Sequence, residues 1–323
     1  MNPRRSFLQC ALAATLAATV ASAHAADPYP SKPIQLYVSF APGGVGDLVA
    51  RVVARQLTAS MGQAVVIENR PVPVIGPTLV ARSRPDGYTL AMTGNGTSLT
   101  QSLFKSLPYD LMKDFTHVST LSSFDLALVT SSDSPFNSVA DVLAYARANP
   151  GKLNIGSARI GSTQNLSAEL FKSMSGIKAL IVPYKTTAEE ITAIRSKDVQ
   201  VVFEIVPAML GQINSKQVKV LAVTSSARYP GLPNVPTIAE SGLPGFEATS
   251  WNGISAPAKT PPEVVAKLNA ELRKAVADPQ VQKELLALGV VPGAGTPADM
   301  TKRMAGDIAK WGAVIDKAGI PKQ

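Results

Sequence analysis

Strand-like and helix-like segments alternate along most of this chain, and that alternation restricts its fold more than any other feature. A β-rich run over residues 34–40 is followed by a glycine-containing turn and then by apolar residues at helical spacing over residues 48–61. Gly62 ends this helix, and residues 64–68 form the next expected strand. Because strands that alternate with helices form largely parallel sheets, the sequence predicts an α/β fold.

The alternation starts again near residue 126, which indicates a second α/β unit. Ser138 is the expected N-cap of the first helix in this unit. The C-terminal part is predicted to be helical from Pro261 onward, and the last helix carries an apolar stripe that indicates core packing. This stripe consists of Met300, Met304, Ile308, Trp311 and Ile315. The length of the chain is typical of two domains rather than one.

The first 25 residues have the pattern of a secretory signal. Arg4 and Arg5 precede an apolar stretch over residues 7–23, and the segment Ala23-His24-Ala25 is a small-x-small cleavage pattern. We expect cleavage after Ala25 and export to the periplasm. The paired arginines fit both a Sec signal and a twin-arginine signal, so both export routes stay open. No later stretch reaches about 18 apolar residues, and no transmembrane helix is expected in the mature protein.

Cleavage would remove the only cysteine, Cys10, so that the mature protein has neither a disulfide nor a thiolate nucleophile. It would also lower Lys plus Arg from 31 to 29 against 23 Asp plus Glu, a net charge near +6, which suits an anionic ligand. The basic residues are scattered and no nucleic-acid motif occurs. His117 is the one histidine left, and no catalytic or metal-binding spacing surrounds it. We expect no cofactor, no metal and no catalytic residue.

Two glycine-containing turns stand between a strand and a helix, where free backbone N–H groups and the helix dipole favour carboxylates and phosphates. Asp47 is expected in the first helical turn after the first of them. The first turn supplies the candidates Ala41, Pro42, Gly43, Gly44, Gly46 and Asp47. The second turn supplies Arg159, Gly161, Ser162, Thr163 and Asn165. Ser162 and Thr163 fit both an N-cap and a ligand donor, and Arg159 fits bidentate pairing with a carboxylate.

Two further groups of candidates follow strands of the second unit. Tyr184, Lys185 and Thr186 follow one strand, and Glu204 follows the next. The C-terminal ends of parallel strands share one edge of a sheet, where ligands of α/β proteins bind. Glu204 indicates either an internal ion pair with Arg159 or Lys185, or a ligand that carries a donor group.

Many short segments in a fixed order give the chain a resemblance to the substrate-binding proteins of tripartite tricarboxylate transporters, known as Bug receptors. The resemblance covers nearly all of the mature chain. It is carried by the segments Tyr29-Pro30-Ser31-Lys32-Pro33-Ile34, Phe40-Ala41-Pro42-Gly43-Gly44, Glu68-Asn69-Arg70-Pro71, Pro85-Asp86-Gly87-Tyr88-Thr89-Leu90, Leu107-Pro108-Tyr109-Asp110, Val182-Pro183-Tyr184-Lys185 and Val235-Pro236-Thr237-Ile238-Ala239-Glu240-Ser241-Gly242.

The resemblance implies a type II periplasmic-binding-protein fold, with two α/β lobes that are joined by two crossing strands and close by hinge motion. Residues 26–124 and 251–323 would form the first lobe, and residues 125–250 the second. It further implies a monomeric receptor that holds a small carboxylate between its lobes, performs no chemistry on it, and serves membrane transporter subunits. The first glycine turn and the turn at Gly161, Ser162 and Thr163 would hold the carboxylate.

The chain departs from the family pattern around the expected mouth of the site. Thr97 stands where the family has a Thr-His pair, and Asn165 replaces a histidine. Thr186 replaces a glycine, and Glu204 replaces an aspartate. These changes leave the identity of the carboxylate open, and they leave open whether the protein serves transport or sensing.

Two enzymatic alternatives stay open. Gly44, Gly46 and Glu68 resemble the fingerprint of an NAD-dependent oxidoreductase, although Val49 stands at the position of its third glycine. A cofactor-free isomerase or lyase that acts on a carboxylate could use Asp47, Lys185 or Glu204.

Overall fold

The first strand of the first lobe is a short aliphatic run that buries every second side chain. The computed structural model describes residues 28–323, and the predicted signal segment 1–25 lies outside them. β1 (Ile34–Val38) buries Ile34, Leu36 and Val38. It pairs in parallel with β2 (Val65–Asn69) and with β3 (Thr89–Gly94). The predicted parallel α/β arrangement is therefore confirmed for this half of the sheet.

Helices connect these strands and begin close to the predicted residues. α2 follows β1 and ends at Gly62, which adopts the left-handed conformation that stops a helix. α3 follows β2, and α4 follows β3 directly. Their bounds are α2 (Val45–Met61), α3 (Ile75–Ala81) and α4 (Asn95–Leu103).

The second lobe repeats this construction. Three parallel strands lie in the order β7, β5, β6, and each is followed by a helix. The strands are β5 (Leu153–Ala158), β6 (Ala179–Tyr184) and β7 (Val201–Ile205), with β8 (Val218–Val223) nearby. The helices are α5 (Val139–Ala148), α6 (Thr163–Ser175), α7 (Thr187–Arg195) and α8 (Val206–Asn214). Ser138 caps α5 by accepting a hydrogen bond from the Asp141 N–H, as predicted.

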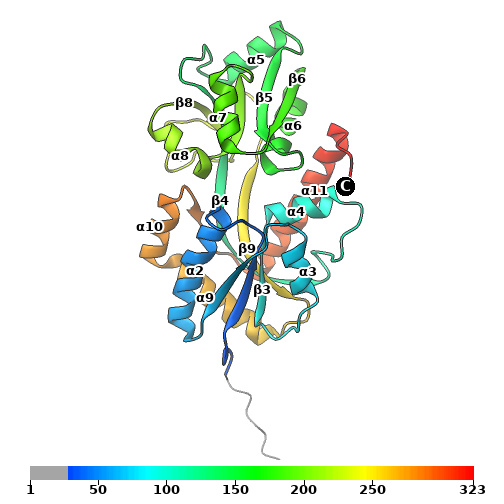
Figure 1. Ribbon diagram of the computed structural model, residues 1–323, viewed down its shortest axis with the longest axis vertical. Coiled ribbons are helices and arrows are strands. Elements are labelled where there is room, and N and C mark those ends of the chain that lie inside the picture. Colours follow the sequence, from blue (N-terminus) through cyan, green and yellow to red (C-terminus); the bar gives the residue numbers. More distant parts are fainter. Residues whose placement is uncertain (1–27) are drawn as a thin grey trace, which may run out of the picture. The chain divides into compact units, whose positions relative to one another are not determined.

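Two long antiparallel strands run between the lobes (Figure 1). β4 (Phe115–Ser131) pairs with β9 (Thr249–Pro257) from Phe115 to Asp125, and from Leu126 onward it pairs with β7 and β8 instead. β9 also pairs with β3, so the strand order is β2-β1-β3-β9-β4-β7-β5-β6. Two crossing strands thus join two α/β lobes, which is the predicted type II architecture. The exact lobe bounds stay a prediction.

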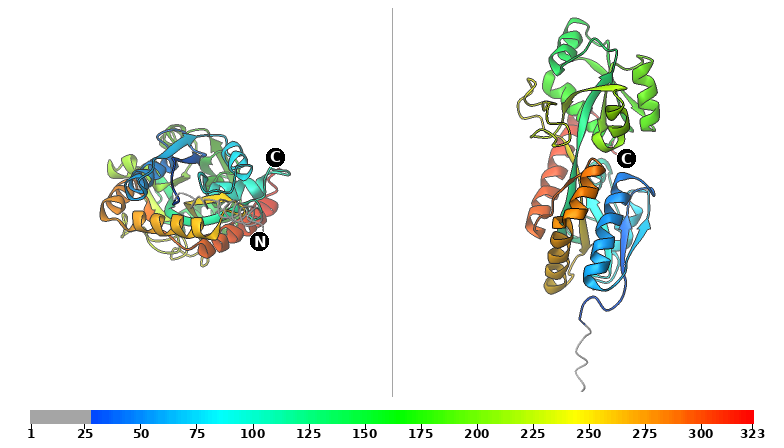
Figure 2. Two further views of the ribbon diagram at one scale, coloured as in Figure 1. Left: turned by 90° about the horizontal axis from the view of Figure 1, so that it is seen from below. Right: turned by 90° about the vertical axis from the view of Figure 1, so that its left-hand side faces the viewer.

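The C-terminal helices pack around the crossing strands. They are α9 (Pro262–Ala277), α10 (Pro279–Ala287) and α11 (Pro297–Ala318), with the short β10 (Val291–Pro292) between the last two. α11 runs beside β4 and contacts α4 and α6 (Figure 2). Met300 and Met304 pack near Trp251, whereas Trp311 and Ile315 join the core of the second lobe. The predicted core stripe of α11 is confirmed, and the helix contributes to both lobes.

Within residues 28–323, no helix combines the length and the apolar character that crossing a bilayer requires.

His117 lies in β4, where burial lowers its pKa to about 4. Its Nδ1 is 2.9 Å from Ser255 Oγ, which is 2.6 Å from Thr93 Oγ1. His117 is therefore neutral in the folded protein at pH 7, while an unfolded histidine titrates near 6.5. Because only the unfolded state binds a proton between these values, the free energy of unfolding should decrease as the pH falls from about 6.5 to about 4.

This gives the first prediction. The contribution of His117 to the acid-induced loss of stability should approach about 3 kcal/mol over that interval. His117→Asn keeps a polar atom near Ser255 but cannot titrate, so its stability should depend less on pH by this amount. Urea unfolding of both proteins between pH 7 and 4 measures the difference, and parallel pH profiles would contradict the assignment.

Candidate ligand-binding site

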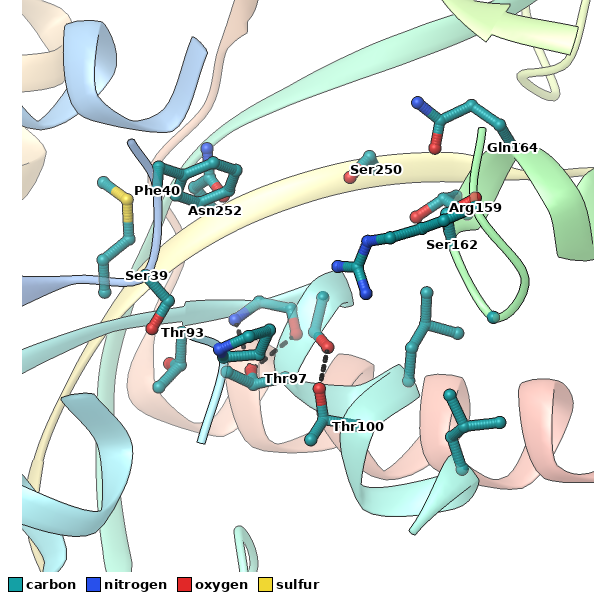
Figure 3. Close-up of a pocket in the computed structure, with 18 of the residues that line it drawn as sticks. Ser39, Phe40, Thr93, Thr97, Thr100, Arg159, Ser162, Gln164, Ser250 and Asn252 are labelled. Carbon is teal, nitrogen blue, oxygen red and sulfur yellow. Dashed lines mark hydrogen bonds between the residues drawn. The ribbon is translucent and has the colours of Figure 1, made fainter. Parts of the chain in front are cut away.

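A cavity of about 480 Å³ lies between the two lobes. Its walls come from the residues after β1, from β3 and α4, from the loop between β5 and α6, and from the crossing strand β9 (Figure 3). The carboxyl ends of β1, β3 and β5 thus open on one space, as is usual for ligand sites of α/β folds.

Five predicted site residues line this cavity, and the others do not. Those that line it are Thr97, Arg159, Gly161, Ser162 and Thr163. Those that do not are Ala41, Pro42, Gly43, Gly44, Gly46, Asp47, Asn165, Tyr184, Lys185, Thr186 and Glu204. For the second group, direct contact with a ligand stays a prediction that the cavity does not support.

Asp47 lies in the first turn of α2, as predicted, and its carboxylate is fully engaged within the protein. It accepts hydrogen bonds from the Gly43 N–H at 2.8 Å, from Asn69 Nδ2 at 2.8 Å and from Arg51 Nε at 2.9 Å. Burial alone would raise the pKa of Asp47, but the hydrogen bonds from Arg51, Asn69 and Gly43 together lower it below its ordinary value. An internal anion therefore occupies the N-terminus of α2.

Gly46 has a packing role in the same turn. A Cβ atom at this position would overlap the ring of Phe40, so the glycine lets the ring lie against the backbone of α2. Phe40 and Val45 in turn line the cavity. The first glycine turn therefore shapes the wall through its flanking residues.

The turn of the second lobe is rigid. Ser162 caps α6 by accepting a hydrogen bond from the Asn165 N–H at 3.1 Å, which confirms the predicted N-cap. Gly161 has a φ of 77°, a conformation that favours glycine, and a Cβ there would also meet Leu103. Asn165 is buried and binds the Gly161 N–H and Ser157 Oγ, so it holds the turn from behind.

Thr163 connects the two lobes through a series of hydrogen bonds. Its Oγ1 donates to Asn95 Oδ1 at 2.5 Å, and Asn95 Nδ2 donates to Asp307 Oδ2 at 3.3 Å. The indole Nε1 of Trp251 donates to the same oxygen at 2.6 Å. The guanidinium of Arg303 lies over the Trp251 ring, 4.9 Å from its centroid. These contacts fix α4, α6, α11 and β9 around one end of the cavity.

Arg159 differs from its neighbours because its guanidinium is exposed in the cavity and forms no hydrogen bond or ion pair with any residue of the described chain. It extends from the loop before α6 toward Thr97 and Thr100 of α4 (Figure 3). Those threonines are already engaged: Thr97 Oγ1 binds the backbone of Gly94, and Thr100 Oγ1 donates to the Gly96 carbonyl. The guanidinium is therefore available to an anion.

Sequence reasoning did not identify several polar residues of the cavity. Ser250 and Asn252 lie on β9, Ser39 follows β1, and Gln164 follows Thr163. No motif marks these positions. Only the pairing of β9 with β3 and β4 brings the first two beside the glycine turns.

Glu204 lies behind the cavity wall and is almost completely buried. It accepts hydrogen bonds from Gln164 Nε2 at 2.7 Å, from the Ile205 N–H at 2.6 Å and from Thr187 Oγ1 at 3.2 Å. The hypothesised ion pair of Glu204 with Arg159 or Lys185 does not form among the described residues. Glu204 instead positions Gln164 and Ile205, both of which line the cavity.

The remaining candidates on this side have local roles. Thr186 caps α7, and Glu189 completes the capping box and also accepts a hydrogen bond from the Lys185 N–H. Tyr184 packs in the core that includes Val199 and Val202.

Glu190 of α7 is fully buried. Neither of its carboxyl oxygens has a hydrogen-bond partner among residues 28–323. Burial and the neighbouring Glu204 charge raise the pKa of Glu190. Glu190 is therefore protonated in the folded protein at neutral pH.

No group of three or more His, Cys, Asp or Glu side chains is arranged to hold a metal ion in the described part of the chain.

The second prediction concerns this buried pair. Folding takes up a proton on Glu190, so its contribution to stability is complete below pH 4.5 and is lost as the pH rises toward the pKa of the folded state. Glu190→Gln needs no proton. Its free energy of unfolding should decrease less steeply than that of the wild type between pH 6 and 9, by about 1.4 kcal/mol per pH unit.

Glu189→Gln is the matched control, because Glu189 is exposed on the same helix and glutamine keeps the capping box. Denaturant unfolding at several pH values measures all three proteins. If Glu190→Gln and Glu189→Gln share the pH profile of the wild type, Glu190 is already ionised in the folded state.

Comparison with known proteins agrees with this architecture. The family model described as "Tripartite tricarboxylate transporter family receptor" matches residues 49–320. The protein BugT of Bordetella pertussis is 35% identical over 94% of this chain and 94% of its own length.

Solved structures are also similar. "R. palustris Rpa4515 with adipate" has a TM-score of 0.78 and 34% identity, covering 91% of this chain and 99% of that chain. "Structure of periplasmic binding protein BugD" has a TM-score of 0.76 and 33% identity, covering 91% of this chain and 100% of that chain. The chain belongs to the receptor family of the tripartite tricarboxylate transporters.

Proposed function

We propose that this protein is a periplasmic receptor that captures a small carboxylate between its two lobes for a tripartite tricarboxylate-type transporter. Family membership supports the receptor role and the membrane partner. The similar protein solved with adipate supports a carboxylate as the ligand class. The periplasmic binding protein BugD supports the location. A cleaved signal before Ala26 and a monomeric state complete the proposal.

The free guanidinium of Arg159 is the one observation on which the assignment of a carboxylate ligand depends. It is the one charged side chain among the described residues that line the cavity. A guanidinium offers paired N–H donors that match the two oxygens of a carboxylate. An unpaired cation facing a partly enclosed cavity therefore favours an anion there.

Two helix N-termini border the cavity. Gly94, Gly96 and Thr97 begin α4, and Ser162 and Thr163 begin α6. The N-terminal N–H groups of a helix have no partner within the helix and carry partial positive charge. The proposed carboxylate lies between these termini and pairs with Arg159.

The oxidoreductase alternative receives no support from Glu68, the residue that would bind a ribose. Its carboxylate accepts a hydrogen bond from Gln35 Nε2 at 3.1 Å and pairs with Arg70. Catalysis by Asp47 or Glu204 is equally unfavoured, since both carboxylates are buried and bound by internal donors. We therefore propose a binding protein without catalytic activity.

The third prediction is that small carboxylates raise the melting temperature of the protein and that Arg159→Gln weakens their binding. Loss of a charge-assisted hydrogen bond costs about 1.5–3 kcal/mol, which corresponds to roughly 10- to 150-fold in Kd. A thermal-shift screen against mono-, di- and tricarboxylates finds the ligand, and calorimetry gives Kd for both proteins.

The protein should be unfolded, washed and refolded beforehand, so that a ligand retained from the cell does not hide the effect. Arg147→Gln is the control, because Arg147 is exposed on α5 and does not line the cavity. If the wild type, Arg159→Gln and Arg147→Gln bind the carboxylate with equal affinity, the anion does not bind at Arg159. A refolded protein that no carboxylate stabilises would contradict the proposed function.

A further inference from the structure

We propose that Asn252 on the crossing strand β9 is a specificity-determining residue. It forms a hydrogen bond with an uncharged polar group at the end of the ligand opposite its carboxylate. This proposal rests on the proposed function, because it presupposes that Arg159 holds a carboxylate. It assigns the ligand to a narrower class: acids that carry one charge and a hydroxyl or similar neutral group at the far end.

The amide of Asn252 is buried without being satisfied. The side chain is 3% exposed, and its Nδ2 has no hydrogen-bond partner among residues 28–323. A buried donor without a partner costs free energy, so such groups are few in folded proteins. Asn252 also lines the cavity, where a bound molecule can satisfy it.

The neighbouring strands explain why the protein does not satisfy this amide itself. In register with Asn252 are Gly94 on β3 and Ser122 on β4. Gly94 has no side chain, because a Cβ there would overlap the Trp251 carbonyl oxygen. The hydroxyl of Ser122 is buried and is itself without a partner in the described structure. Asn252 thus has no polar partner on either side.

The two free groups on β9 lie along one face of the strand. Ser250 precedes Asn252 by two residues, and alternate residues of a strand point to the same side, about 6.5 Å apart. The hydroxyl of Ser250 has no hydrogen bond to the described residues, and it also lines the cavity. Figure 3 places Ser250 between Asn252 and Arg159. A ligand that pairs with Arg159 can therefore extend along β9 toward Asn252.

The Asn252 end differs from the Arg159 end in charge. Ser39, whose buried hydroxyl is also unpartnered, lines the cavity together with Phe40 and Val45 at the start of α2. The N-terminus of that helix already holds the Asp47 carboxylate. No cationic side chain of the described cavity lining remains for a second carboxylate, and burying an unpaired charge is costly. An amide and a hydroxyl each donate and accept, which suits a neutral polar group.

The facing wall is apolar. Leu99 and Leu103 of α4, together with Phe104, give the cavity an apolar part of its wall. A ligand with an aliphatic middle would bury apolar surface against them. The class that fits is a straight-chain acid with a neutral polar group at its ω-position.

The test compares straight-chain acids of four to eight carbons in three forms, which differ only at the ω-carbon: methyl, hydroxymethyl and carboxylate. Calorimetry measures Kd for each acid with the refolded protein. At the preferred length, the ω-hydroxy acid should bind about tenfold more tightly than the plain acid and at least as tightly as the diacid. Asn252→Leu should remove the tenfold preference for the ω-hydroxy acid over the plain acid.

Asn252→Ala repeats the test without the bulk of leucine. Ser122→Ala is the matched control, because it removes a buried, unpartnered hydroxyl on the neighbouring strand but does not border the cavity. Its preference for the ω-hydroxy acid should match that of the wild type. Retained binding of the plain acid shows that each variant is folded.

Four results would overturn the inference. If the diacid binds more tightly than the ω-hydroxy acid, the Asn252 end of the cavity recognises a charged group. If the wild type does not distinguish the plain acid from the ω-hydroxy acid, or if the preference survives in both Asn252 variants, Asn252 does not read the ligand. In these cases the proposed function still stands, because the acids bind. If none of these acids binds, the inference fails, and the proposed function is then decided by the wider carboxylate screen.

Discussion

The antiparallel pairing of β4 with β9 is the constraint on which the rest of the structure depends. The ladder runs from Phe115 opposite Pro257 to Asp125 opposite Thr249, and beyond it β4 continues into the sheet of the second lobe. Both strands are buried along nearly their whole length. Each lobe therefore attaches to the same two strands, and the cavity between the lobes has one wall that belongs to neither alone.

This shared wall is held by polar contacts as well as by packing. Trp251 and Asn95 both donate to Asp307, and Asn95 accepts from Thr163 of the second lobe. Because α11 also packs Trp311 into the core of the second lobe, the helix supports this end of the cavity from behind. Among the described residues that line the cavity, Arg159 is the charged side chain, and it has no such support. The site thus combines a fixed wall with one free cation, an arrangement that lowers the cost of ordering the protein on binding.

Sequence patterns predicted the elements better than the contacts between them. Apolar periodicity and caps placed α2, α5 and α6 within a few residues, because these signals are local. Asp47 was correctly expected in the first turn of its helix. Its partner Asn69 follows from the pairing of β1 with β2, which no local signal reveals. The sequence therefore marked Asp47 as a ligand candidate, although its carboxylate is bound internally.

The same limit explains the residues that were missed. The first half of β4 is rich in Ser and Thr and lacks the apolar alternation of a half-buried strand, so no pattern predicts it. Ser250 and Asn252 lie in a run of small and polar residues, which no local pattern marks as a strand or as a site. Asn252 is distinguished by an amide Nδ2 that forms no hydrogen bond. Whether a buried amide finds a partner depends on its neighbours in the fold, which the sequence around the residue does not show.

The two glycine turns look equivalent in sequence, but their charges make them different. At α2 the protein supplies its own carboxylate from Asp47, which accepts a hydrogen bond from the Gly43 N–H. At α6 the N-cap is the neutral Ser162, and the Arg159 cation lies in the same cavity lining. A helix N-terminus that already carries an anion repels a second one, whereas a neutral cap beside a guanidinium attracts it. The cavity is therefore polarised along β9, and the proposed function accordingly orients the carboxylate of the ligand toward Arg159 of the second lobe.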